Sequence, residues 1–309
     1  MYCKVLAIKK KFALLSYHRN AATRGWAVST GSVRHLRSRM SDSAKQRPYR
    51  ARTLFLSDIH LGYSRARARE LVDFLQSIEA ETIVLVGDIV DGMSLAKRFF
   101  WAEEHTQVVR MLLARRRAGA RLLYLPGNHD ASLAIFADLL RGQVEVHREW
   151  VHRTARGERL LITHGDRFDE DMACPPWLYF IGDVLYEATL AVNHRLNDVR
   201  RSFGWPYHPL AERLKLAVGT SVRYIRRFEQ LAAAHARTEG YDGIVCGHIH
   251  RPNLCRIDGT IYCNTGDWVE SCSALIEDLS GELQLRRWPH SEQRTYRLEP
   301  PPPLLADAA

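Results

Sequence analysis

Residues 53–62 read TLFLSDIHLG, a short apolar run that ends in a polar cluster. The same pattern recurs as TIVLVGDIVD at 82–91, RLLYLPGNHD at 121–130, RLLITHGD at 159–166 and GIVCGHIH at 243–250. Short apolar runs with such boundaries are typical of buried strands. In open α/β sheets, ligands bind just beyond the carboxyl ends of strands. We therefore expect the five polar clusters to meet at one edge of the fold.

The segments between these runs predict helices. One apolar helical face contains Leu71, Phe74, Leu75 and Ile78, and a second, ending near Gly119, contains Val108, Met111 and Leu112. Strands that alternate with helices indicate βα units and a largely parallel sheet. Three later strand-like segments with glycines between them look antiparallel; they are Thr260–Cys263, Ala274–Glu277 and Glu282–Arg287.

The spacing of the clusters predicts an insertion. His164 and His248 are 84 residues apart, about twice the separation between any other neighbouring clusters. Residues 171–238 read as largely helical, with an apolar side between Trp177 and Leu190. We expect this segment to form a helical cap over the site.

The clusters carry the residue types of a metal site. Imidazoles and carboxylates together suit Mn, Fe or Zn better than Ca or Mg. Two residues that are two positions apart at a strand end point to the same side, as in the pairs DIH and HIH. The expected ligands are Asp58, His60, Asp88, Asn128, His164, His248 and His250. Two ions roughly 3.5–4 Å apart can clamp a phosphate and lower the pKa of a water between them.

A single DxH or GNHD motif is weak evidence for a metal site, because an isolated histidine is usually a core or surface residue. Five such clusters in order, each after a strand, favour the metal site over coincidence. The glycines Gly87, Gly127, Gly165 and Gly247 would allow tight turns and close backbone approach at these ends.

The set DIH, GDIVD, GNHD, THGD and GHIH resembles the calcineurin-like metallophosphoesterase superfamily, over about residues 53–278. The resemblance implies an α/β fold, a four-layer αββα sandwich, with two divalent ions. One ion would be held by Asp58, His60, Asp88 and His250, and the other by Asp88, Asn128, His164 and His248. His129 matches the histidine that protonates the leaving group. Asp91 and Asp130 either support the ligands or have capping or solvated roles.

Within the superfamily, the chain looks similar to bacterial UDP-2,3-diacylglucosamine diphosphatases. The likeness lies in FLSDIHLG, the insertion, GHIHRP and NTGDWVES. It implies Mn as the metal, with Fe or Zn as alternatives, and cleavage of a pyrophosphate at the α-phosphorus. The chain departs from that branch at His129, where the branch tends to carry Arg.

The insertion suits an amphiphilic substrate. Residues 195–227 hold eight Lys and Arg against two acids, and Trp177–Leu190 supplies apolar surface. We expect the substrate to contact Trp177, Arg223, Arg226 and Arg227, or the same surface to touch an anionic membrane leaflet. A helix that packs on its own domain with a solvated basic face explains the pattern equally well.

Charge is unevenly distributed along the 309 residues. The net charge is +9, but residues 1–52 hold 13 basic residues and one acid, so the remainder, with 31 basic and 34 acidic residues, is close to neutral. This distribution argues against nucleic acid as a partner. We expect residues 1–50 to be a leader outside the fold, with Met40 as an alternative start, 51–298 to be the domain, and 299–309 to be a disordered tail.

Six scattered cysteines without a CxxC pair favour a reducing compartment. We expect a cytoplasmic enzyme, with peripheral contact at the inner membrane face as an option, acting on a small-molecule or lipid-linked phosphoester. A general phosphodiesterase or protein phosphatase of the same superfamily is the alternative. A non-catalytic scaffold of the same fold ranks last, since every expected position is filled. The oligomeric state is not indicated.

Overall fold

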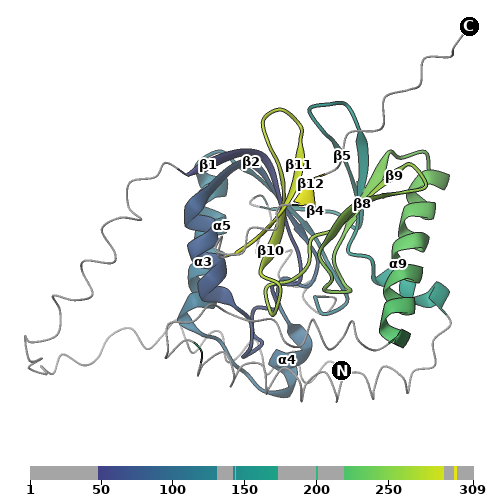
Figure 1. Cartoon of the computed structure of the whole chain (residues 1–309). Coiled ribbons are helices and arrows are strands. Elements are labelled where there is room, and N and C mark those ends of the chain that lie inside the picture. Colours follow the sequence, from purple (N-terminus) through teal and green to yellow (C-terminus); the bar gives the residue numbers. More distant parts are fainter. Residues whose placement is uncertain are drawn as a thin grey trace, which may run out of the picture.

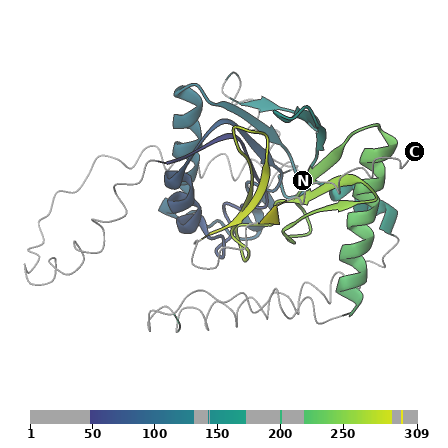
Figure 2. The same cartoon turned by 45° about the horizontal axis from the view of Figure 1, so that its top comes forward.

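The computed structural model describes residues 48–130, 142, 144–172, 200, 219–288 and 296–297. Two β-sheets face each other, and helices cover the outer face of each sheet (Figure 1). Figure 2 shows the same order of layers after rotation, with α3 and α5 on one side and α9 on the other. The expected αββα sandwich is confirmed.

The first sheet has the strand order β12-β11-β10-β1-β2-β3-β4. Its four parallel strands are β1 (Tyr49–Leu56), β2 (Ile78–Val86), β3 (Arg121–Leu125) and β4 (Glu145–Val146). The antiparallel part, joined to β1 through β10, consists of β10 (Ser273–Glu277), β11 (Leu283–Arg287) and β12 (Tyr296–Arg297).

The second sheet has the order β5-β6-β7-β9-β8. Its strands are β5 (Trp150–Arg153), β6 (Arg159–Ile162), β7 (Gly243–Cys246), β8 (Asn253–Ile257) and β9 (Thr260–Asn264). The prediction of one largely parallel sheet followed by antiparallel strands is wrong in one respect: β9 runs parallel to β7. The hairpin partner β8 reverses the chain first, so that β9 returns in the direction of β7.

Helices α3 (Ala68–Ser77) and α5 (Glu103–Arg117) cover the first sheet. On α3, the buried side chains Leu71, Phe74 and Leu75 follow helical spacing and form one apolar face. Ile78, predicted to continue that face, instead opens β2. The short helix α4 (Gly92–Lys97) follows β2, and a 3₁₀ helix, η3 (Asp166–Met172), follows β6.

The interior has an apolar layer between the sheets and one beneath each outer helical layer. Along β1, Phe55 faces the second sheet, whereas Leu54 and Leu56 face α3 and α5, because successive side chains on a strand point to opposite faces. This packing on both faces explains why the strands read as continuous apolar runs.

Helix α9 (Gly219–Thr238) forms the outer layer over β7 and β9, where Phe228, Ala232 and Ala236 are buried. The final twenty residues of the segment expected to form a cap therefore belong to the sandwich. Most of the remainder of that segment, the leader up to residue 47 and the tail after residue 297 lie outside the described residues. Within the described part, no helix is long and apolar enough to cross a membrane.

Candidate metal centre

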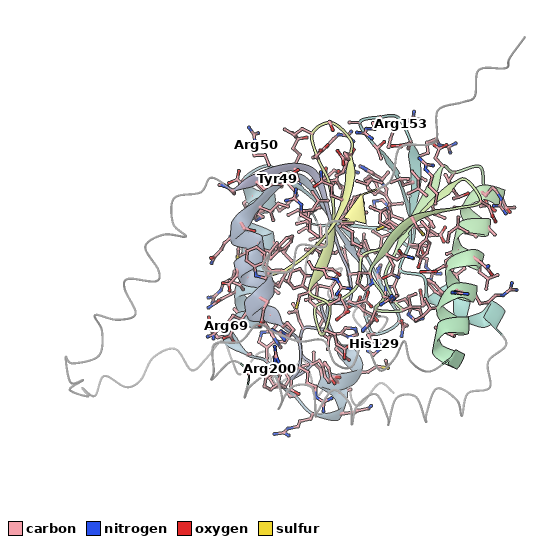
Figure 3. All side chains as sticks on the ribbon, viewed as in Figure 1. Tyr49, Arg50, Arg69, His129, Arg153 and Arg200 are labelled. Carbon is pink, nitrogen blue, oxygen red and sulfur yellow. The ribbon has the colours of Figure 1, made fainter. Side chains whose placement is uncertain are left out.

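The five polar clusters follow β1, β2, β3, β6 and β7 at one edge of the sandwich. Figure 3 shows His129 at this edge and Tyr49, Arg50 and Arg153 at the opposite edge. The backbone is distinctive here, because Asp58, His60, Asp88, His248 and His250 all have φ between 49° and 69°. Left-handed backbone is uncommon in residues other than glycine and often marks functional sites. The turns thus aim five side chains that regular strands would point elsewhere.

One group of side chains joins the first cluster to the last. His250 Nε2 lies 3.1 Å from Asp58 Oδ1 and 3.3 Å from His60 Nε2. The ligand atoms of Asp58, His60 and His250 all lie within 4.8 Å of one another. His60 Nε2 also lies 3.9 Å from Asp88 Oδ2. These four residues are the set expected to hold one ion.

A second group lies on the other side of Asp88. His164 Nε2 lies 3.4 Å from Asp88 Oδ2 and 3.2 Å from Asn128 Oδ1. The other ring nitrogen, Nδ1, is 3.0 Å from the carbonyl oxygen of Val86. A carbonyl only accepts, so Nδ1 carries a proton, and Nε2 is the nitrogen that faces Asp88 and Asn128 and is available to a metal ion.

His248, the fourth residue of the second set, is placed differently. Its ring lies beside that of His164, with centroids 5.2 Å apart, but its Nε2 is 2.7 Å from Asp169 Oδ2. It belongs to none of the three Asp/His groups whose ligand atoms lie within 4.8 Å of one another. The structure thus brings all seven expected ligands to one edge, and their binding of metal stays a prediction.

His129 lies beside the first group and is partly exposed. Its Nδ1 is 3.2 Å from Asp91 Oδ1, and its ring meets that of His60 edge-on. The other Asp91 oxygen lies 3.4 Å from His60 Nδ1. Asp91 also caps α4 by accepting the Ser94 backbone N–H, so the capping role is observed, and the contact with His60 keeps the supporting role a prediction.

Asp130 instead supports the backbone of these turns. Its buried carboxylate accepts backbone N–H groups of Ile89, Val90 and Gly127. It therefore ties the GNHD turn to the GDIVD turn.

The electrostatics of the edge favour bound cations. Burial alone would raise the pKa of Asp58, but the charges of His250, His164 and His60 outweigh burial and hold it well below its usual range. Burial would lower the pKa of His164, yet its hydrogen bond to Asp88 and the charges of Asp88 and Asp58 raise it to about 10. Buried carboxylates thus draw protons onto the imidazoles, and divalent cations held by the same atoms would satisfy that negative charge. The donor set fits two such ions.

Glycines allow the turns to approach the carboxylates. A Cβ on Gly127 would lie 2.3 Å from Asp88 Oδ1, and one on Gly247 would lie 2.3 Å from Asp58 Oδ2. Ser57 and Asn264, which the sequence reading missed, tighten the same region. The Ser57 hydroxyl is 2.5 Å from both Asp58 Oδ2 and Thr265 Oγ1, and the Asn264 amide donates to the Gly247 carbonyl. Their only sequence signal is that they are the first residues of the motifs SDIH and NTGD.

The residues predicted to bind substrate are only partly described. Arg226 and Arg227 are exposed on α9. Trp177 and the side chain of Arg223 lie outside the described residues.

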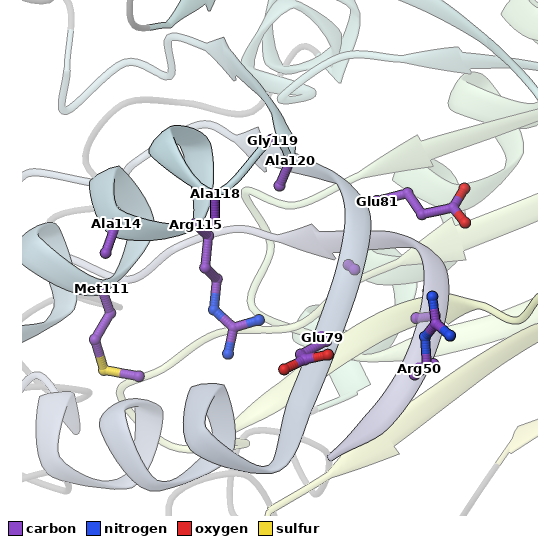
Figure 4. A pocket seen from close by; sticks show the side chains of 11 residues that line it. Arg50, Glu79, Glu81, Met111, Ala114, Arg115, Ala118, Gly119 and Ala120 are labelled. Atoms are coloured by element: carbon purple, nitrogen blue, oxygen red, sulfur yellow. The ribbon is translucent and has the colours of Figure 1, made fainter. Parts of the chain in front are cut away.

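A hollow of about 680 Å³ lies at the opposite end of the first sheet, between β1, β2 and α5 (Figure 4). Its lining includes Glu79, Glu81 and Arg115 but no histidine. It lacks the donors that the edge with the five clusters supplies, so it is not the metal centre.

The sequence profile of the Calcineurin-like phosphoesterase family matches residues 51–252, and the chain belongs to this family. No curated protein matches the chain. Similar solved structures include Vacuolar Protein Sorting 29 from Cryptosporidium parvum (13% identity, 79% of this chain and 95% of that chain, TM-score 0.40). A novel archaeal phosphodiesterase is 14% identical, and the match covers 80% of this chain and 99% of that chain with a TM-score of 0.35. Phosphopantetheinyl hydrolase from Mycobacterium tuberculosis is 13% identical, and the match covers 71% of this chain and 90% of that chain with a TM-score of 0.35.

Proposed function

We propose that this protein is a two-metal phosphoesterase that hydrolyses a phosphodiester or pyrophosphate. The position of Asp88 is the observation that carries the proposal. Its Oδ2 lies 3.9 Å from His60 Nε2 on one side and 3.4 Å from His164 Nε2 on the other. One carboxylate between two donor groups is suited to bridge two ions. When bound, these ions would supply Lewis-acid activation of the phosphoester and of the attacking water.

His129 is the proposed proton donor to the leaving group. It is the most exposed of the five imidazoles at the centre, with 28% of its side chain exposed, so a substrate can reach it. Asp91 would fix its orientation through Nδ1, which leaves Nε2 to exchange the proton. The backbone N–H of His129 donates to Asp88 Oδ1 at 2.8 Å, so the proton donor is tied directly to the bridging carboxylate.

Mn is the proposed metal, because the site mixes four imidazoles with carboxylates and an amide oxygen; Fe and Zn are the alternatives. UDP-2,3-diacylglucosamine or a related nucleotide-linked lipid is the proposed substrate. The sequence likeness in FLSDIHLG, GHIHRP and NTGDWVES supports it, together with the basic residues before and within α9. In this proposal the enzyme works in the cytoplasm, at the inner membrane face. A general phosphodiesterase or protein phosphatase is the second candidate.

The metal chemistry is tested by comparing two substitutions. Asp88→Ala should abolish both turnover and retention of two ions per chain, because Asp88 Oδ2 lies within 4 Å of an imidazole nitrogen of each group. His129→Ala should keep both ions and lower kcat roughly 10²–10⁴-fold, as expected for loss of a general acid. Metal content by elemental analysis and kcat would be measured on the same preparations. Equal metal loss in both variants would contradict the role of His129, and two bound ions without turnover of any phosphoester would favour a scaffold.

The substrate is tested by comparing UDP-2,3-diacylglucosamine with bis(p-nitrophenyl) phosphate. An Arg226→Ala/Arg227→Ala variant should lose kcat/KM for the lipid-linked substrate at least tenfold more than for the small diester, since only the larger molecule reaches α9. Arg237→Ala, an exposed arginine at the far end of α9, is the control. If kcat/KM fell by the same factor for both substrates, the assignment of a lipid-linked substrate would be contradicted, whereas the proposed metal chemistry would be unaffected.

A further inference from the structure

Asp169 links the metal centre to two elements outside the five clusters. It lies on η3, and one of its oxygens, Oδ2, is 2.7 Å from His248 Nε2. The other oxygen, Oδ1, accepts the hydroxyl of Tyr224 on α9 at 2.8 Å. Both oxygens are therefore engaged, and neither Asp169 nor Tyr224 was expected from the sequence.

This contact determines which nitrogen of His248 is free. An ionised carboxylate only accepts hydrogen bonds, so Nε2 of His248 must carry a proton, which makes Nδ1 the nitrogen that can coordinate a metal ion. His164 shows the mirror arrangement, because its Nδ1 is hydrogen-bonded to the Val86 carbonyl and its Nε2 faces Asp88 and Asn128. Each histidine of the second group is thus held by a hydrogen bond at the nitrogen that does not coordinate.

The ring of His248 is also restrained from other directions. Its backbone N–H donates to Asp58 Oδ2 at 3.0 Å, and the ring of Phe228 lies against it with centroids 6.1 Å apart. Phe228 and Tyr224 both come from α9, and η3 packs against this helix (Figure 1). The orientation of one metal ligand therefore depends on contact between η3 and α9.

We propose that Asp169 is a positioning residue that orients His248 toward the second metal ion, and that Tyr224 holds Asp169 in place. The inference rests on the proposed function only in requiring that two ions bind. A carboxylate behind a coordinating histidine fixes the tautomer and raises the basicity of the ligand, and removing such a partner typically costs 10–100-fold in metal affinity.

Calorimetric titration of Mn²⁺ into chelator-stripped protein tests the proposal without using turnover. In Asp169→Asn, an amide NH₂ competes for His248 Nε2, so the dissociation constant of one ion should rise about 10–100-fold, while that of the other changes less than about threefold. Tyr224→Phe should raise the same constant by a smaller factor, because the carboxylate remains. Asp258→Asn, an exposed aspartate in the β8–β9 turn, removes the same charge and should change neither constant.

A second measurement covers the case in which Asp169→Asn loses its fold. Long-range ¹H–¹⁵N correlation spectra of the metal-free wild type should show His248 with its proton on Nε2, assigned by the signal lost in His248→Gln. The opposite tautomer overturns the proposal, as does Asp169→Asn that binds both ions with wild-type affinity. Wild-type protein that binds fewer than two ions would instead overturn the proposed function.

Discussion

Gly247 shows how closely the chain packs around one carboxylate. A Cβ at this position would lie 2.3 Å from Asp58 Oδ2 and 2.5 Å from Ser57 Oγ. Both atoms belong to one hydrogen-bonded network, which also includes Thr265 and the backbone N–H of His248. A methyl group here cannot be accommodated by the movement of one flexible side chain alone.

We therefore expect Gly247→Ala to displace Asp58, to weaken Mn²⁺ binding at least tenfold and to lower the free energy of unfolding by about 1–3 kcal/mol, as overpacking does. Titration calorimetry and urea denaturation would measure the two effects. Gly259→Ala is the control: its φ of +82° makes alanine strained, but no atom lies within 4 Å of the added methyl. It should lose stability and keep metal affinity. Wild-type affinity in Gly247→Ala would show that the close approach is unnecessary.

At the level of single residues, the sequence predicted the expected metal ligands but not the residues that hold those ligands in place. The seven expected ligands all follow apolar runs, so their meeting at one edge could be predicted from their position at the carboxyl ends of strands. Asp169 could not be found in this way, because its partner His248 is 79 residues away and η3 has no periodic apolar pattern. Ser57 and Asn264 were missed because their role depends on close contacts between turns, which spacing does not encode.

Among the elements, β10, β1 and β5 meet at one buried carboxylate, Glu277. Its Oε2 lies 2.7 Å from both Thr53 Oγ1 and His152 Nε2, and its Oε1 accepts from Arg52 and from the Ala155 backbone. This cluster connects the two sheets. Burial would raise the pKa of Glu277, but the hydrogen bonds from His152, Thr53 and Ala155 and the charge of His152 lower it to about 2.

We expect Glu277→Gln to destabilise the protein by roughly 3 kcal/mol at pH 7, because the carboxyl pKa falls from about 4.5 in the unfolded chain to about 2 in the folded chain. A depressed carboxyl pKa stabilises the fold above the unfolded value of about 4.5. That contribution declines as the pH falls from there towards 2. The gap in unfolding free energy between wild type and variant should thus narrow between pH 7 and pH 3.5. A gap independent of pH would mean that packing, not charge, is lost.

The elements themselves were predictable where they are long and apolar. The interiors of β1, β2, β3, β6 and β7 match their expected runs, because strands packed on both faces have little polar content. By contrast, β8 contains Arg256 and only one of its five residues is buried, so its sequence has no continuous apolar run. Without β8 the direction of β9 could not be inferred. Ile78 was assigned to a helix because its spacing from Phe74 and Leu75 also fits a helical face.

At the level of the whole molecule, the candidate metal centre combines residues that follow strands of both sheets. Asp58, Asp88 and Asn128 follow strands of the first sheet, whereas His164 and His248 follow strands of the second. Ions bound there would join the two halves of the sandwich, and any ligand that binds only the folded state stabilises it.

Removal of metal should therefore lower the melting temperature. An ion present at 100 times its Kd contributes about 2.7 kcal/mol, which corresponds to a shift of roughly 5–10 °C for a domain of this size. Scanning calorimetry with excess Mn²⁺ and with chelator would measure the shift. Asp88→Ala is the matched control and should melt at the same temperature under both conditions. A wild type that is indifferent to chelator would contradict the proposal that ions bridge the sheets.

The left-handed backbone at Asp58, His60, Asp88, His248 and His250 also bears on how such a protein evolves. Each of these residues occupies a conformation that glycine adopts without steric penalty, at a cost on the order of 1 kcal/mol. In a phosphoesterase of the kind proposed above, selection for catalysis and selection for stability would thus pull in opposite directions at these five positions. A descendant that had abandoned catalysis would be free to drift there towards glycine or asparagine. It would then be more heat-stable than an active relative stripped of its ions.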